Sequence, residues 1–134
     1  KIREYFQNKM RFEPNSEIII DDSKLDQEFI NKIVLHIENN IQNPELNINN
    51  LTAEFHMSRS SLFRKIKSLT GLSLTGLIKT IKLKKAAQLI LQSDLKLSTI
   101  AYETGFNDYK YFKLSFKEQF SCLPSEYKSK ILTK

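Results

Sequence analysis

Apolar residues recur every three or four positions over most of this chain, the spacing that places side chains on one face of an α-helix. The longest stripe covers residues 25–41 and predicts an amphipathic helix that ends before Asn43-Pro44. Its apolar positions are Leu25, Phe29, Ile30, Ile33, Val34, Ile37 and Ile41. Residues 1–24 show only a short helical pattern and then Pro14 and an Asp-Asp-Ser turn, so we interpret them as an N-terminal helix and interdomain linker.

Two helix-turn-helix patterns follow, at about residues 47–70 and 97–120. In each, a short helix leads through a turn to a longer helix, which in this arrangement can enter a DNA major groove. The turn holds His56 in the first pattern and Gly105 in the second. Glycine adopts a positive φ freely, whereas histidine does so at some cost. The expected N-caps are Ser58, Ser98 and Asn107, and the expected stop after the first long helix is Gly71.

The two patterns are copies of one another. Their turns repeat at an offset of 49 residues, so that Gly105 corresponds to His56. The apolar positions of the long helices repeat at an offset of 50 residues, so that Phe112 corresponds to Leu62. We therefore expect the second long helix to be one residue longer than the first.

The segment between the patterns, about residues 73–92, predicts a long linker helix capped by Ser73. One face of it is apolar, and its members are Leu77, Ile78, Ile81, Ala87, Ile90 and Leu91. A flank beside that face is basic and contains Lys79, Lys82, Lys84 and Lys85. Near the end of the chain, Pro124 opens a last short helix that we expect to pack Tyr127 and Ile131 onto the second unit.

The stretch IAYETGF, with YF, FK and PSEY after it, resembles the second helix-turn-helix of the AraC/XylS-type transcription regulators. The first copy resembles the same family's Met-Ser-Arg-Ser pattern. The resemblance implies an all-α DNA-binding domain over residues 25–134, in which two helix-turn-helix subdomains are joined by the long linker helix. The chain departs from the family at His56, where relatives usually have glycine, and at Leu114, where they often have arginine.

Residues 1–24 resemble the segment that joins a receiver domain to such an output domain in hybrid two-component sensors. The resemblance therefore implies a longer, signal-responsive bacterial parent, which could carry kinase activity or a membrane anchor elsewhere. RNA polymerase and, in the full-length protein, a second copy forming a homodimer are further partners that it implies.

Positive charge is concentrated in the second part of the chain. The formal net charge is +6, yet residues 1–24 are neutral, residues 25–57 carry −4, and residues 58–134 carry +10. A basic module of this kind fits a polyanion, so we predict double-stranded DNA as the partner. The alternative is a helical protein-interaction module that uses its basic face on acidic partners.

Side chains that point away from the apolar positions are the candidates for DNA contact. On the first unit they are Arg59, Ser60, Phe63, Arg64 and Lys67, and on the second they are Asn107, Tyr109, Lys110, Lys113 and Lys117. By the resemblance, Ser60, Phe63 and Arg64 fall where the family reads base edges. Arg64 can make the bidentate contact to guanine, and Phe63 either meets thymine methyl groups or forms an edge of the core. We expect both Lys65 and Lys67 to contact phosphate.

Leu114 cannot hydrogen-bond to a base. We therefore expect the first unit to carry more of the base specificity and the second unit to contribute more backbone affinity.

No pattern for catalysis is visible, and we expect neither an enzyme activity nor a cofactor of this domain. The single cysteine, Cys122, cannot form an intramolecular disulfide, and we interpret it as a buried or turn residue rather than as an activated nucleophile. His36 and His56 have no third ligand at metal spacing, so no metal is expected. No apolar run reaches the length of a membrane span, and we expect a cytoplasmic domain without membrane contact.

Overall fold

In a computed structural model, residues 23–43 and 48–132 are described, and these form seven α-helices and no strand. The helices are α2 (Lys24–Asn39), α3 (Ile48–Phe55), α4 (Arg59–Thr70), α5 (Leu74–Gln92), α6 (Leu97–Glu103), α7 (Tyr109–Phe120) and α8 (Pro124–Leu132). The predicted all-α class with two helix-turn-helix units is therefore confirmed. The predicted N-terminal helix and most of the predicted linker, within residues 1–22, lie outside the described residues.

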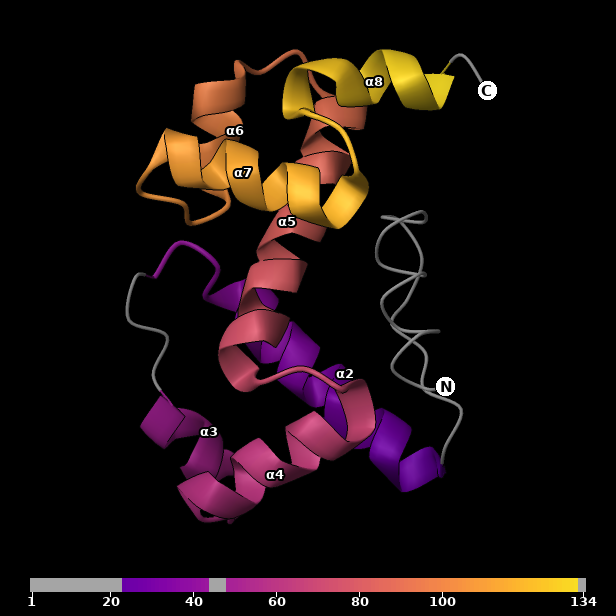
Figure 1. Ribbon diagram of the computed structural model, residues 1–134. Coiled ribbons are helices and arrows are strands. Elements are labelled where there is room, and N and C mark those ends of the chain that lie inside the picture. The colour runs from indigo at the N-terminus through magenta and orange to yellow at the C-terminus, as the bar shows by residue number, and fades with distance from the viewer. Residues whose placement is uncertain (1–22, 44–47, 133–134) are drawn as a thin grey trace.

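Helix α5 stands in the middle of the molecule, and the other helices group around its two ends (Figure 1). Helices α2, α3 and α4 form a first unit with the N-terminal half of α5, which contacts both α2 and α4. Helices α6, α7 and α8 form a second unit with its C-terminal half, and all three contact α5. Each unit therefore has four helices, and α5 belongs to both.

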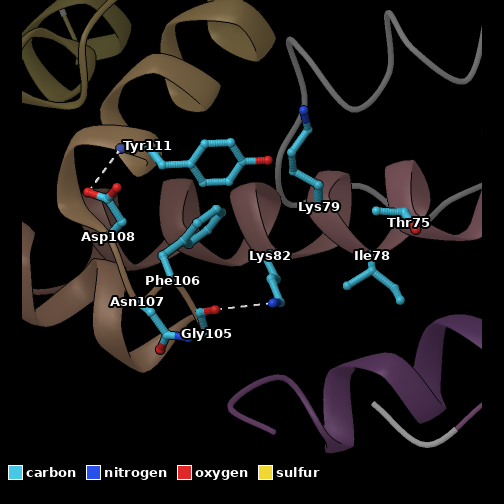
Figure 2. Close-up of a pocket in the computed structure, with 9 residues that line it drawn as sticks. All are labelled: Thr75, Ile78, Lys79, Lys82, Gly105, Phe106, Asn107, Asp108 and Tyr111. Atoms are coloured by element: carbon cyan, nitrogen blue, oxygen red, sulfur yellow. Dashed lines mark hydrogen bonds between the residues drawn. The ribbon is translucent and has the colours of Figure 1, made fainter. Parts of the chain in front are cut away.

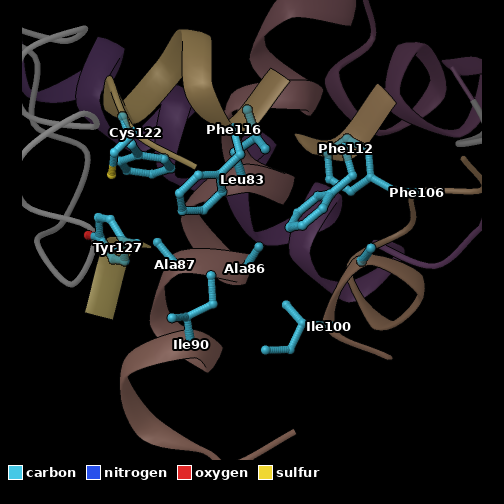
Figure 3. Close-up of a cluster of buried hydrophobic side chains, with 12 residues drawn as sticks. Leu83, Ala86, Ala87, Ile90, Ile100, Phe106, Phe112, Phe116, Cys122 and Tyr127 are labelled. Atoms are coloured by element: carbon cyan, nitrogen blue, oxygen red, sulfur yellow. The ribbon is translucent and has the colours of Figure 1, made fainter. Parts of the chain in front are cut away.

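The two units have separate hydrophobic cores that meet different faces of α5. The first core takes Leu74, Leu77 and Ile81 from α5, whereas the second takes Leu83, Ala86, Ala87 and Ile90 (Figure 3). At about 100° per residue, these two sets point to roughly opposite sides of the helix. The expectation of one apolar face with a basic flank is therefore wrong for α5. Lys84, which was expected on the basic flank, is buried.

Two expected N-caps are one or two residues away from the observed ones. Helix α6 begins after Lys96, which makes no side-chain capping bond, and Ser98 lies inside the helix. Helix α7 begins after Asp108, whose carboxylate accepts a hydrogen bond from the backbone N–H of Lys110 at 2.9 Å. Asn107 therefore belongs to the turn.

The extra residue of the second copy lies in that turn, so the expectation of a longer second helix is wrong. Both α4 and α7 have twelve residues. Their N-caps, Ser58 and Asp108, are 50 residues apart (108 − 58), and so are their left-handed C-caps, Gly71 and Ser121 (121 − 71). The first residues of α5 and α8 keep the same offset.

The first helix of the domain also departs from its predicted stripe at both ends. Leu25 is 76% exposed, because the first turn of α2 extends beyond the residues that pack on the core. Ile41 lies after the last residue of α2, where it is half-buried. Ser23 caps the helix through its hydroxyl, which accepts a hydrogen bond from the Asp26 N–H at 3.1 Å.

Candidate nucleic-acid interface

Helix α4 offers a polar and basic surface on the side opposite its core positions. Leu62, Ile66 and Leu69 are buried, which turns the remaining side chains outward. The five candidates on this helix are all exposed: Arg59, Ser60, Phe63, Arg64 and Lys67. Phe63 is 36% exposed, and the Arg59 guanidinium lies 5.9 Å from the centre of its ring. An arginine stacked on an exposed ring makes a flat surface that combines charge with apolar contact.

Lys65 does not belong to this surface, contrary to the expectation that it contacts phosphate. Its ammonium group lies 4.6 Å from the ring centre of Phe29 and 3.8 Å from an Asp26 carboxylate oxygen. Both partners are on α2, so Lys65 ties the second helix of the motif to the helix that precedes it.

Helix α7 offers the corresponding surface in the second unit. Tyr109, Lys110, Lys113 and Lys117 are exposed on it, and Asn107 is exposed in the turn that precedes it. The Lys113 ammonium lies 5.4 Å from the ring centre of Tyr109, so these two side chains form one patch.

Tyr111 and Leu114 are also exposed on α7, by 51% and 57%, and neither was among the sequence-based candidates. A helical wheel centred on the buried residues of the helix would have placed both outward.

The offset of 50 residues pairs the exposed positions of α4 and α7 one by one. Lys67 corresponds to Lys117, so one basic position is retained. Arg64, by contrast, corresponds to Leu114, and Phe63 corresponds to Lys113. The two units therefore present different chemistry from equivalent places.

A row of aromatic side chains supports α7 from inside (Figure 3). The ring centres of Phe112 and Phe116 are 5.8 Å apart, and those of Phe116 and Phe120 are 4.5 Å apart. Tyr127 of α8 closes the row with an edge contact to Phe116 at 5.3 Å. Rings packed at these distances are worth more than their area alone, so they stabilise the packing of α8 against α7.

Burial changes the ionisation of two groups in this core. Desolvation raises the pKa of Tyr127 to about 12, and it also raises the pKa of the Cys122 thiol. Cys122 is buried, as expected, and a raised pKa keeps its thiol protonated at neutral pH. A nucleophilic cysteine needs the opposite shift.

An open cavity of about 300 Å³ lies between α5 and the turn of the second unit (Figure 2). Its lining includes Lys79 and Lys82 of α5, together with Phe106 and Tyr111. Lys82 is half-buried, and its ammonium group donates a hydrogen bond to the carbonyl oxygen of Gly105 at 3.1 Å. Desolvation by burial lowers the pKa of Lys82.

The described part of the chain contains no group of three or more His, Cys, Asp and Glu side chains that could hold a metal ion. Among the helices of residues 23–43 and 48–132, none is long and apolar enough to cross a membrane.

Two capped helices that turn basic and polar side chains outward, held on one shared helix, define a helix-turn-helix DNA-binding domain. The protein family described as a helix-turn-helix domain matches residues 51–130. The chain belongs to this family, and it is an AraC/XylS-type DNA-binding domain of transcription regulators.

Known proteins resemble both its sequence and its fold. It is 33% identical over 130 residues to histidine kinase P4 of Formosa agariphila, which covers 97% of this chain and 9% of that protein. It is 30% identical over 95 residues to the transcriptional activator RhaS of Mannheimia succiniciproducens, covering 71% of this chain and 35% of RhaS. The C-terminal domain of AraT, a response regulator from Geobacillus stearothermophilus, superposes with a TM-score of 0.67 at 26% identity, over 81% of this chain and 88% of AraT's. The chain thus spans less than a tenth of histidine kinase P4 and about a third of RhaS.

Proposed function

We propose that this domain binds double-stranded DNA sequence-specifically, with α4 and α7 in successive major grooves. The observation that carries the proposal is the repeat itself. Two helices of equal length, 50 residues apart, both expose a basic and polar surface on the side opposite a packed core. A protein-interaction module would not need two copies of one groove-sized helix.

Arg64 is the candidate for direct base recognition in the first unit. Its guanidinium is exposed near the middle of α4, where it can reach two acceptors on guanine at once. The other candidates there are Arg59, Ser60, Phe63 and Lys67. In the second unit, Asn107, Tyr109, Lys110, Lys113 and Lys117 contribute chiefly contacts to the phosphate backbone.

The length of α5 suits a monomer that spans two grooves. Its nineteen residues extend over about 28 Å, and equivalent groove faces of B-DNA lie about 34–36 Å apart. Because the helix is shorter than this spacing, we expect the DNA to bend by tens of degrees. Such a bend costs on the order of 1–6 kcal/mol.

We further propose that the domain is the C-terminal output module of a two-component type protein. The support is that almost all of this chain matches histidine kinase P4, and that the matched segment makes up 9% of that protein. In this proposal residues 1–24 are the junction with the preceding domain, and any kinase activity belongs to the missing part of the parent. RNA polymerase and a second copy of the parent are its further partners.

A salt titration of duplex affinity tests the DNA proposal. If about six phosphates are contacted and each releases about 0.9 counterion, the log–log slope is near −5. A slope shallower than about −2 would mean that the basic face is merely solvated, which favours the protein-interaction alternative. A circular-permutation gel shift then measures the bend, and protection of only one groove would contradict the model with two reading helices.

A further inference from the structure

A small polar junction connects the first unit to the turn of the second. It consists of Ile41 and Gln42 from the connection after α2, Lys82 from α5, and Glu103 and Gly105 from the second helix-turn-helix. These residues come from three separate parts of the chain, and together they form the inter-unit junction.

Gly105 lies at the centre of the inter-unit junction. Its φ is 87°, and a Cβ atom there would collide with the carbonyl oxygen of Ile41. The same Cβ would lie 3.2 Å from the ammonium nitrogen of Lys82. Glycine therefore allows the second turn to approach both the first unit and the shared helix.

Lys82 holds this approach in place (Figure 2). Its ammonium donates to the Gly105 carbonyl oxygen at 3.1 Å and lies 5.8 Å from the ring centre of Phe106. Outside the helix, the amide of Gln42 donates to a carboxylate oxygen of Glu103 at 2.8 Å. Both bonds connect the turn region of the second unit to elements that are anchored in the first.

The position of Lys82 along α5 gives these bonds their effect. Ile81 is the last α5 residue in the first core, and Leu83 is the first α5 residue in the second. Each core holds its own unit on one half of α5, and the helix links the two. The bonds of Lys82 and Gln42 to the turn region of the second unit add to this link at the point where one core gives way to the other.

We propose that Lys82 is a positioning residue that orients α7 relative to α4 and thereby sets which spacing between two half-sites the domain accepts. This inference rests on the proposed function. Without the Gly105 bond, the second unit turns more freely on α5, and the preference for one spacing is lost before affinity for a single half-site.

The test compares Lys82→Met, which keeps the unbranched stem as far as Cε but cannot donate, with Lys82→Arg, which can. Lys85→Met is the matched control, because Lys85 is an exposed lysine on the same helix and its loss removes the same charge. Each variant of the 134-residue chain is titrated with duplexes whose half-sites have the best spacing or one base pair more or less. We expect Lys82→Met to reduce the preference for the best spacing about three- to tenfold, which is what one hydrogen bond provides. Lys82→Arg restores the preference, and Lys85→Met lowers affinity equally at every spacing.

A measurement without DNA separates failure of this inference from failure of the proposed function. Spin labels on Ser68→Cys and Glu118→Cys, two exposed and equivalent positions, report the distance between α4 and α7 when Cys122 is replaced by Ser. The distance distribution should broaden in Lys82→Met and stay narrow in Lys85→Met. An unchanged distribution overturns the inference, whatever the DNA titrations give, and a broad distribution with an unchanged spacing preference overturns its link to specificity.

Gln42→Ala provides a second variant in case Lys82→Met does not fold. Gln42 is exposed, so its truncation spares the cores and removes only the bond to Glu103. A smaller broadening in the same direction supports the inter-unit junction, and none at all counts against it.

Discussion

The two helix-turn-helix units share one backbone plan and present different surfaces. Their long helices have the same length, begin 50 residues apart and end in left-handed C-caps. On that plan, Arg64 of the first unit is replaced by Leu114 in the second, and Phe63 is replaced by Lys113. Buried positions therefore preserve the fold of a unit, whereas exposed positions are free to decide what it binds.

The interiors of the units differ as well. The first core is mainly aliphatic, with Ile66 and Leu77 fully buried. The equivalent positions of the second core hold Phe116 and Tyr127, so rings fill the space there. The same helices are thus held by two kinds of packing, and this difference is open to test.

The largest effect is expected from truncating the equivalent core positions. Phe116→Ala should lower the free energy of unfolding by about 3–5 kcal/mol, and Ile66→Ala by about 2–5 kcal/mol, because each leaves a cavity in a fully buried site. Urea titrations followed by circular dichroism measure both. Since α5 belongs to both cores, each variant should unfold in one transition, and two separated transitions would show that the units are independent.

The first unit has Arg64 where the second has Leu114, and this predicts a difference in base recognition. Arg64→Ala should cost about 1–3 kcal/mol on the best site and relax the base preference of one half-site. Leu114→Ala is the matched control, since it truncates the equivalent exposed position. Affinities for a library of point-substituted duplexes measure both variants. A greater loss of preference in Leu114→Ala would reverse the assignment of roles.

The first core has Leu77 where the second has Tyr127, and this predicts that the stability of the second unit depends on alkaline pH. Burial raises the pKa of Tyr127 from 10.0 to about 12, so its protonated form is favoured in the folded state. The stability that this contributes is complete below about pH 10 and is lost as the pH rises towards 12. Urea midpoints between pH 9 and pH 12 should fall less steeply in Tyr127→Phe.

Tyr127→Phe should itself cost little, because the Tyr127 hydroxyl has no hydrogen-bond partner among the described residues. The control is Tyr102→Phe, at a tyrosine that is 68% exposed. If Tyr127→Phe and the unmodified chain lose stability in parallel over this range, Tyr127 is not the group responsible.

The second unit has Lys113 where the first has Phe63, and this predicts a DNA contact without sequence preference in the second unit. Lys113→Ala should weaken binding to all duplexes by the same factor and make the salt slope shallower by about 0.9, because one phosphate contact is lost. Titrations on specific and random duplexes at several salt concentrations would show this. A loss confined to the specific duplex would assign base recognition to Lys113.

The smallest effects are expected where each unit has a non-glycine residue at a positive φ. His56 has a φ of 53° in the first turn, as expected from its equivalence to Gly105. Ser121 has a φ of 66° at the second C-cap, the position equivalent to Gly71. His56→Gly and Ser121→Gly should each raise stability by about 0.5–1 kcal/mol, since glycine adopts this conformation without strain. Thermal melting measures the change, and a lower melting temperature in both would mean that their side chains contribute contacts that outweigh the strain.

The sequence by itself determined the helices, the repeat and the buried positions of each long helix. These features depend on local rules: apolar side chains at helical spacing, a cap such as Ser58 that bonds three residues ahead, and a glycine such as Gly71 that ends a helix. Most candidate DNA contacts were found in the same way, because a side chain opposite a buried stripe is exposed. That Lys113 and Arg64 are exposed therefore needed no tertiary information.

Only the tertiary structure decided where α7 is capped and where the lysines of α5 lie. Asn107 was the expected cap, and the observed one is Asp108 because the turn is one residue longer. Lys82 and Lys84 were expected on one basic flank, yet Lys82 joins the inter-unit junction and Lys84 is buried. A one-dimensional pattern cannot show that α5 packs against two units on roughly opposite faces, because each half of the helix follows the periodicity of a different core.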